Sequence, residues 1–290
     1  MLVPPIRTTK RALPGSRNRA AVVGSAIVAA ILLFAVFGPL LVTKDPNASD
    51  FARGISPDHL PVGPSSAFPL GTDRLFRDQL SRLAVGARVS LFIGIAATVV
   101  ASVVGAVVGI VAGWFEGQTI DTVLMRIVDV GLAFPFLLIV MALGAALDRT
   151  TSTTIFLTLG LTGWLGTARV LRAKTLQIRH HDFVTAARAL GQSTPRILLR
   201  HVLPNVMGPL VVVSTVSVAQ MILAESVLSY LGAGIAPPTP TWGHMLFDGQ
   251  DYITTSPWIA VAPGAAIMLS VLGFNLLGEG LRDALDPQKH

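Results

Sequence analysis

Long apolar stretches, separated by shorter polar segments, dominate the chain. Six of them approach the ~20 residues that a helix needs to cross ~30 Å of hydrocarbon. These stretches are residues 20–42, 89–114, 125–147, 153–171, 206–231 and 258–277. Lipid offers no hydrogen bonds to the backbone, so only helices or closed barrels can cross it, and runs this long exceed barrel strands. The pattern predicts an all-α membrane protein with six transmembrane helices.

The first apolar stretch, 20–42, could be mistaken for a signal peptide because Arg17 and Arg19 precede it. It is longer than a typical signal-peptide core, and no small-x-small cleavage site follows. We therefore interpret it as an uncleaved membrane anchor.

The polar segments divide the chain further. Residues 1–19 are expected to form a tail, and 43–88 a segment outside the membrane with one short amphipathic helix at about 73–83. The remaining helices and loops would form a core at 89–281, followed by a second tail at 282–290.

The distribution of Lys and Arg predicts the orientation. If the N-terminus is cytoplasmic, fifteen of these residues lie on the cytoplasmic side and seven on the other. Cytoplasmic loops carry the excess of positive charge in membrane proteins. We therefore expect both termini, and the polar segment 173–205, to be cytoplasmic.

That segment contains HDFVTAARALGQSTPRILLRHVLPN at 181–205. Phe183, Ala186, Ala187 and Leu190 follow i, i+3, i+4, i+7 spacing, which predicts a short helix with one narrow apolar face. The two small alanines on an exposed face would let the backbone of another protein come close.

Local signals set the limits of this helix and predict another after it. Asp182 is expected as the N-cap, and Gly191 as a left-handed stop. Pro195 fits the first turn of a second helix, which should end or kink near Pro204. The segment is thus predicted to be a rigid helix, glycine corner and helix.

This segment resembles the coupling loop of importer-type ABC permeases, whose pattern is E-A-A, three residues, G, nine residues, then I-x-L-P. The matching positions are Thr185, Ala186, Ala187, Gly191, His201, Leu203 and Pro204. Two of them differ from the general pattern, Thr185 in place of Glu and His201 in place of Ile, although H-x-L-P-N is similar to the peptide-permease branch.

Other stretches resemble the same branch. They are FPLGTDRLFRDQLSRLAVGARVSL, MRIVDVGLAFPF, SYLGAGIAPPTPTWGHML and FNLLGEGLRDALDP. The chain is most similar to the second ("C") membrane subunit of dipeptide, oligopeptide and nickel transporters. One departure is Phe76, where the family usually has Gly in GTDxxGRD.

The resemblance implies a type I ABC importer permease fold with cytoplasmic coupling helices, in a bacterial plasma membrane. It implies a second, similar permease subunit, two cytoplasmic ATPase subunits and an extracytoplasmic solute-binding protein, with short peptides or nickel as cargo. This chain lacks G-x-x-x-x-G-K-[ST], so ATP and magnesium would be held by the partner subunits. The residues expected to couple to the ATPases are Asp182, Phe183, Ala186, Ala187, Gly191, Arg196, Arg200, His201, Leu203 and Pro204.

Polar residues inside the apolar stretches are candidates for the transport path, because ionisable groups in hydrocarbon are costly. Glu225 lies deep in 206–231, with Gln220 before it and Ser226 after it. Two interpretations remain open, a lining of the path and a structural polar contact. Asp129 is expected to pair with Arg126 three residues earlier.

Two further sets of residues carry predictions. Gly105, Gly109 and Gly113 form a small-x-x-x-small stripe, which predicts close helix packing. The segment 232–257 contains Trp242, Asp248 and Asp251 but no Lys or Arg. We hypothesise that these three residues help the solute-binding protein to dock on an acidic outer surface.

Composition narrows the alternatives. The 290 residues are 52% hydrophobic and 13% charged, too apolar for an ordinary soluble domain, and they contain no Cys. The pI near 10.5 is explained by basic residues beside the spans, which can meet anionic lipid, so no nucleic-acid role is expected.

Catalytic and metal chemistry are not indicated. His180, His181 and His201 lie at the predicted coupling segment and not in a metal-ligand spacing, so no metal site is expected. No nucleophile–base pair suggests an enzyme. A proton-coupled secondary transporter with Glu225 as relay is the rival interpretation, but it should show inverted repeats with broken helices, and none is visible.

Overall fold

The computed structural model describes residues 16–146 and 151–285 of the chain, and every regular element in these ranges is a helix. Most of the predicted tails, 1–19 and 282–290, lies outside the described residues. The long helices are α1 (Ser16–Leu41), α2 (Gln79–Trp114), α5 (Ser152–Arg179), α8 (Leu203–Tyr230) and α10 (Trp258–Ala284). The short ones are α3 (Thr119–Ala133), α4 (Phe136–Ala145), α6 (Asp182–Ala189), α7 (Thr194–Ile197) and α9 (Trp242–Gly249).

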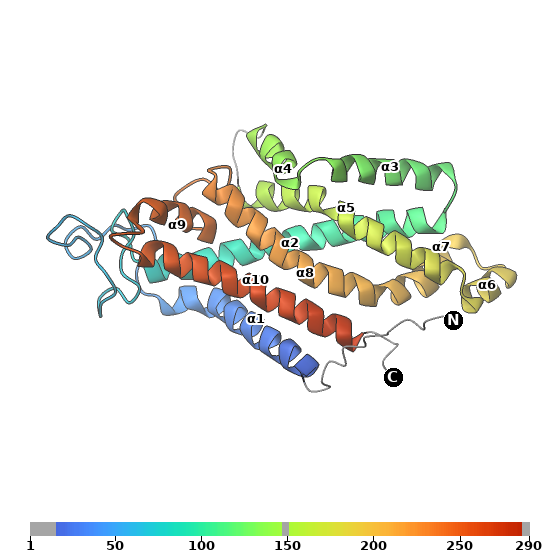
Figure 1. Ribbon diagram of the computed structural model, residues 1–290, viewed down its shortest axis with the longest axis horizontal. Coiled ribbons are helices and arrows are strands. Elements are labelled where there is room, and N and C mark those ends of the chain that lie inside the picture. The colour runs from blue at the N-terminus through green and yellow to red at the C-terminus, as the bar shows by residue number, and fades with distance from the viewer. Residues whose placement is uncertain (1–15, 147–150, 286–290) are drawn as a thin grey trace, which may run out of the picture.

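The long helices lie side by side along the longest dimension of the molecule (Figure 1). The segment 42–78 and helix α9 gather at one end, and α6 and α7 lie at the other. The first turn of α1 and the last turn of α10 are directed toward the end that carries α6. The fold therefore places segment 42–78 and α9 at one end, which we call the outer end after its predicted orientation, and a projecting helical corner at the other.

Five helices in the described ranges are long and apolar enough to cross a membrane, and α3 and α4 together make a sixth candidate that is bent by 90°. The span predicted at 125–147 is therefore not one continuous helix within the described residues. Pro135 lies at the break, and Phe134 before it is extended (φ −94°, ψ 141°). Proline disfavours the helical conformation of the residue that precedes it, which accounts for the bend.

Helices α2 and α5 pack closely because the glycine stripe of α2 faces α5, as predicted. A Cβ on Gly105 would lie 2.7 Å from the Cβ of Thr167, and one on Gly109 would lie 2.5 Å from the carbonyl oxygen of Ala168. Gly113 is equally close to the backbone of α5. Small residues at such positions let the two backbones approach, which is a main source of helix association in lipid.

Helix α1 packs against α10 and α2 and exposes much of its remaining apolar surface. Pro39 lies inside α1 and cannot donate a hydrogen bond to the carbonyl of Ala35. The Nε of Arg88 donates to this carbonyl (3.3 Å), and its Nη2 donates to that of Val36 (3.0 Å). Arg88, on α2, thus compensates for the proline and ties the two helices together.

The expected amphipathic helix at 73–83 does not form. Helix α2 begins only at Gln79, and Asp78 caps it by accepting a hydrogen bond from the Ser81 amide (2.8 Å). The preceding residues form a tight turn in which Phe76 has a φ of +60°. Left-handed geometry suits glycine, which explains the glycine of the family pattern, yet the turn is retained with Phe here.

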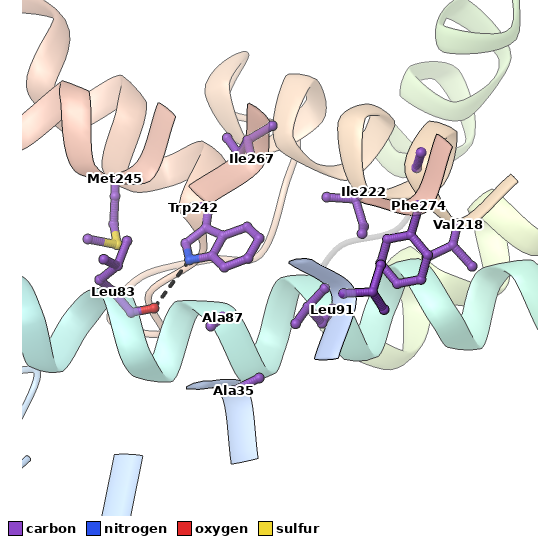
Figure 2. Close-up of a cluster of buried hydrophobic side chains, with 12 residues drawn as sticks. Ala35, Leu83, Ala87, Leu91, Val218, Ile222, Trp242, Met245, Ile267 and Phe274 are labelled. Carbon is purple, nitrogen blue, oxygen red and sulfur yellow. Dashed lines mark hydrogen bonds between the residues drawn. The ribbon is translucent and has the colours of Figure 1, made fainter. Parts of the chain in front are cut away.

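A buried cluster of apolar side chains holds α9 against α2 (Figure 2). Trp242 is 1% exposed, and its Nε1 donates to the carbonyl oxygen of Leu83 (3.2 Å). Met245 and Ala87 belong to the same cluster. Helix α9 is therefore packed against the outer end of the bundle.

Replacing Gly109 with Ala should destabilise the protein by about 1–3 kcal/mol, because the added methyl group would collide with a backbone carbonyl that cannot move alone. Gly166→Ala in α5 is the matched control, since a Cβ there meets nothing within 4 Å. The measurement is the apparent melting temperature of each purified variant in detergent. Equal melting temperatures for the two variants would contradict the packing argument.

Candidate functional site

The corner between α6 and α7 is built as the sequence indicates, with one correction. Gly191 has a φ of +73°, and the amide of Gln192 donates back to the carbonyl of Ala187 (3.1 Å). This left-handed stop is a common helix ending that glycine favours. Asp182 is the first helical residue and not the N-cap, because His181 occupies that position with extended backbone and no capping side-chain bond. The carboxylate of Asp182 still lies in the first turn, where the helix dipole favours it.

The faces of α6 differ from the prediction. Val184 and Ala187 are buried, and they pack with Ile197 and Val202 in one apolar cluster. Ala187 therefore cannot be part of a surface that another protein contacts. The sequence analysis overlooked Val184. The buried face contains Val184 and Ala187, and so it is shifted by about one position from the predicted apolar face.

The exposed apolar face of α6 is formed by Phe183, Ala186 and Leu190. Phe183 is 42% exposed and Leu190 is 81% exposed. The imidazoles of His181 and His201 flank the Phe183 ring, with centroids at 5.5 Å and 6.3 Å. We call Phe183, Ala186 and Leu190 the α6 face.

The second helix does not end near Pro204, where an end or a kink is predicted. Helix α7 continues through a π-helical turn, Leu198–Val202, directly into α8. The wider turn lies immediately before the proline, and the amide of Leu203 donates to the carbonyl of Leu198. The helix is therefore continuous past Pro204, although a proline and a π-helical turn are both usual causes of a kink.

Side-chain bonds hold the corner against this helix. The Nε2 of His201 and the Oε1 of Gln192 lie 3.2 Å apart, which joins the π-helical turn to the residue after Gly191. The Nδ2 of Asn205 donates to the carbonyl of His201 (2.7 Å). Arg196 and Arg200 are exposed on the same helix. The corner is therefore a stiff unit with a cationic edge.

A second feature is a groove in the membrane-spanning part. A cavity of about 520 Å³ lies between α5, α8 and α10. We call it the polar groove. Its polar lining residues are Thr167, Ser217, Gln220, Asn275, Glu279 and Arg282.

Of the three residues predicted for a path, only Gln220 lines the polar groove. Glu225 is fully buried and accepts a hydrogen bond from the Ser229 hydroxyl (2.7 Å). Ser226 is buried and donates to the carbonyl of Ile222 (2.8 Å). Between the two interpretations left open by the sequence, the structure places Glu225 in a structural polar contact.

Spacing could have revealed part of this lining. Asn275, Glu279 and Arg282 follow i, i+4, i+7 spacing in α10, and Ser217 and Gln220 are three apart in α8. Residues at such intervals share one face of a helix. A polar stripe on each of two otherwise apolar helices could therefore have indicated the polar groove from the sequence alone.

Ion pairs fix α3 beside α5. The Nη2 of Arg169 lies 2.6 Å from Asp129, and Arg172 binds Asp121 with two hydrogen bonds of 2.7 and 2.8 Å. The predicted pair of Asp129 with Arg126 does not form. Sequence spacing showed a possible partner within the helix, but the partner comes from the neighbouring helix.

The outer end contains a buried network of charges. Arg74 and Arg77 approach Asp248 at 2.8 and 3.5 Å, and Arg77 and Arg82 approach Asp73 at 2.6 and 3.1 Å. Arg77, Arg82 and both aspartates are buried. We call these five side chains the outer ion network. It joins the turn before α2 to helix α9.

The network overturns two docking predictions. Asp248 is 4% exposed and Trp242 is 1% exposed, so neither can meet a docking protein directly. Asp251 is exposed, in agreement with its predicted position on a surface.

Burial lowers the pKa of His244, which lies beside Asp248, and the nearby arginines lower it further, while Asp248 opposes the shift. The imidazole is therefore neutral at pH 7.

Comparison with known proteins identifies the architecture. A family model described as "Binding-protein-dependent transport system inner membrane component" matches residues 105–290, and one for the N-terminal membrane domain of oligopeptide transport permease C matches 16–61. The chain belongs to the permease family of ABC importers. It is thus an integral protein of the inner membrane.

Individual relatives agree with this assignment. The permease is 41% identical to oligopeptide transport system permease protein OppC of Escherichia coli K12 over 271 residues, covering 93% of this chain and 88% of that protein. It is 39% identical to OppC of Bacillus subtilis, covering 93% and 86% of the two chains. It is also 39% identical to the di/tripeptide permease DppC of Pseudomonas aeruginosa, covering 94% and 89%.

A solved structure of the inward-facing MetNI methionine ABC transporter has the same fold. The TM-score is 0.57 at 18% sequence identity, over 70% of this chain and 96% of that one.

Among the residues that our structure describes, no group of three or more His, Cys, Asp or Glu side chains could hold a metal ion.

Replacing Asp248 with Asn should destabilise the permease by about 3–5 kcal/mol, because Arg74 and Arg77 would lose a buried counter-charge. Asp251→Asn, at an exposed position on the same outer segment, should change stability by no more than about 0.5 kcal/mol. The apparent melting temperature in detergent distinguishes them. Similar behaviour of the two variants would show that the outer ion network is not a structural element.

Proposed function

We propose that this permease transports short peptides across the plasma membrane, as half of a path completed by a second, similar permease subunit. The main support is the polar groove, an open cavity of about 520 Å³ lined by uncharged polar groups beside the charged Glu279 and Arg282. Peptides carry amide groups and two charged termini, so this mixture matches them chemically. The names of relatives that share about 40% of the sequence point to the same cargo.

The remaining partners follow from the family. Two cytoplasmic ATPase subunits would hold ATP and magnesium, and a solute-binding protein would deliver cargo at the outer end. Both termini would be cytoplasmic. The excess of Lys and Arg supports this orientation, and so does the position of the ends of α1 and α10 toward α6 (Figure 1).

The α6 face is the proposed contact with an ATPase subunit. Phe183 and Leu190 expose apolar surface, and Ala186 between them is small enough for a close approach. Arg196 and Arg200 would meet acidic groups at the edge of that contact. Gly191, His201, Leu203 and Pro204 would keep the corner stiff, and Asp182 would support the start of α6.

Force applied to the α6 face has a direct route to the polar groove. Val184 and Ala187 pack against the helix that continues from α7 into α8, and α8 carries Gln220. When the ATPase subunits close, they would displace the corner and tilt α8 as a rigid body. Such a movement is a hinge or shear transition that alternates access to the groove.

At the outer end, Asp251 remains the candidate for contact with the solute-binding protein, because it is exposed. Trp242 and Asp248 would act only indirectly, by holding α9 in place.

Ala186→Glu should reduce ATP hydrolysis stimulated by the binding protein about tenfold or more, because a charge would be forced into the centre of the proposed contact. Thr185→Glu is the matched control, since it adds the same charge at the adjacent exposed position where the family pattern has Glu. Both are measured in the assembled transporter in liposomes. Normal stimulation in Ala186→Glu would exclude the α6 face as the contact.

The cargo is tested with the same liposomes. With ATP supplied on the ATPase side, a labelled tripeptide should accumulate, and Gln220→Leu should slow its accumulation while leaving assembly and basal ATP hydrolysis intact. Ser226→Ala, a buried position outside the groove, should transport normally. Accumulation of nickel in place of the peptide, or equal peptide transport by both variants, would contradict the proposal.

A further inference from the structure

A separate cavity lies behind the corner that carries the α6 face. It has a volume of about 380 Å³, and it is bounded by the end of α2, the α2–α3 connection, the end of α5, and α6 with the residues after it. We call it the arginine cavity. Its lining residues are Trp114, Phe115, Gln118, Arg179, Arg188, Gln192, Thr194 and Ile197.

Two arginines from different helices line this cavity. Arg179 comes from α5 and Arg188 from α6. Arg188 lies over the ring of Trp114, 4.3 Å from its centroid, which fixes the position of the cation. Among the described residues that line the cavity, none is acidic.

Arg179 is only loosely held by the rest of the chain. Its Nε and Nη1 are inaccessible to solvent and have no hydrogen-bond partner among the described residues. The carboxylate of Glu116 is 3.7 Å from Nη1, too far for a hydrogen bond, and the Glu116 side chain is 45% exposed. A ligand in the cavity would therefore have to reach Arg179 through the rest of its side chain, which is 22% exposed.

We propose that the arginine cavity binds a phosphate-bearing anion, either the headgroup of an anionic lipid or free phosphate. Arg179 and Arg188 supply the positive charge, and arginine suits phosphate because its planar fork can donate two bonds at once. Gln118, Gln192 and Thr194 supply further hydrogen-bonding groups.

The position of the cavity suits the lipid source. It opens at the end of the membrane-spanning helix α2, where Trp114 and Phe115 place aromatic rings beside the arginines. Basic pockets beside interfacial aromatics on the cytoplasmic side of a membrane are typical binding places for anionic headgroups. Only this placement on the cytoplasmic side depends on the proposed function.

A bound phosphate would connect α5 with α6. Arg179 precedes α6 in the chain and Arg188 lies in its last turn, so one anion held by both would fix the start and the end of the corner relative to each other. Occupancy would then set how far α6 can move independently of the bundle.

The test uses the full chain purified in detergent and isothermal titration calorimetry. The probes are dihexanoylphosphatidylglycerol, inorganic phosphate, and dihexanoylglycerol, which has the same acyl chains and no phosphate. We expect saturable binding of the phosphate-bearing lipid and none of dihexanoylglycerol. Arg179→Gln combined with Arg188→Gln should weaken binding about tenfold or more, because two charge-assisted contacts are lost.

Lys174→Gln is the matched control, because it removes an exposed cation from α5 outside the cavity and should not change the affinity. If the double variant does not elute as a folded protein, Arg188→Gln alone, at an exposed position, should still show the loss. Inorganic phosphate binding as tightly as the lipid would identify free phosphate as the ligand, and much weaker binding would identify the headgroup.

The inference is overturned if neither phosphate compound binds, or if binding is unchanged in the arginine variants. Because these measurements need neither cargo nor ATPase, a failure here leaves the transport proposal intact. Conversely, failed peptide transport would not alter the binding result.

Discussion

The contact between α2 and α5 determines where most of the functional elements lie. Three glycines at four-residue spacing on α2 bring its backbone against α5, so the position of α5 is fixed along much of its length. Helix α5 in turn carries Arg169 and Arg172, which anchor α3. Without this close approach, neither the polar groove on one side of α5 nor the arginine cavity at its end would have its observed walls.

At the outer end, the outer ion network keeps several charged side chains buried. Arg77 and Arg82 are almost completely enclosed, and both reach carboxylates that are equally enclosed. A buried pair contributes little net stability over an apolar alternative, but breaking one is costly. The network therefore acts mainly to specify one arrangement of the turn before α2 and helix α9. The indole of Trp242, bonded to the carbonyl of Leu83, also holds α9 in this arrangement. So do Gly243 and Gly249, which bring α9 close to Ser226 and Ala260.

The sequence was sufficient for features that depend on one helix at a time. Apolar length predicted the spanning helices, the glycine spacing predicted the tight face of α2, and Gly191 predicted the corner. It was insufficient where a partner had to be chosen in space. Asp129 binds a cation of another helix, and Asp248, in a stretch without Lys or Arg, finds arginines 171 and more residues away in the chain.

Surface assignments failed for a related reason. In a membrane protein, apolar residues face both lipid and the core, so apolarity alone does not say which side of a helix is buried. In α6 the apolar positions extend around the helix, and the choice between Ala186 and Ala187 required knowing where Ile197 and Val202 lie. Proline was likewise ambiguous, because Pro135 breaks a span and Pro204 does not.

The π-helical turn has a geometric consequence for the whole assembly. With it, Thr194–Tyr230 is one continuous helix of 37 residues. At ~1.5 Å per residue this helix is about 55 Å long, whereas the hydrocarbon layer is only ~30 Å thick. Measured along its axis, the helix is therefore some 25 Å longer than the hydrocarbon layer is thick. Because the helix is continuous, a change in its tilt would move both of its ends at once.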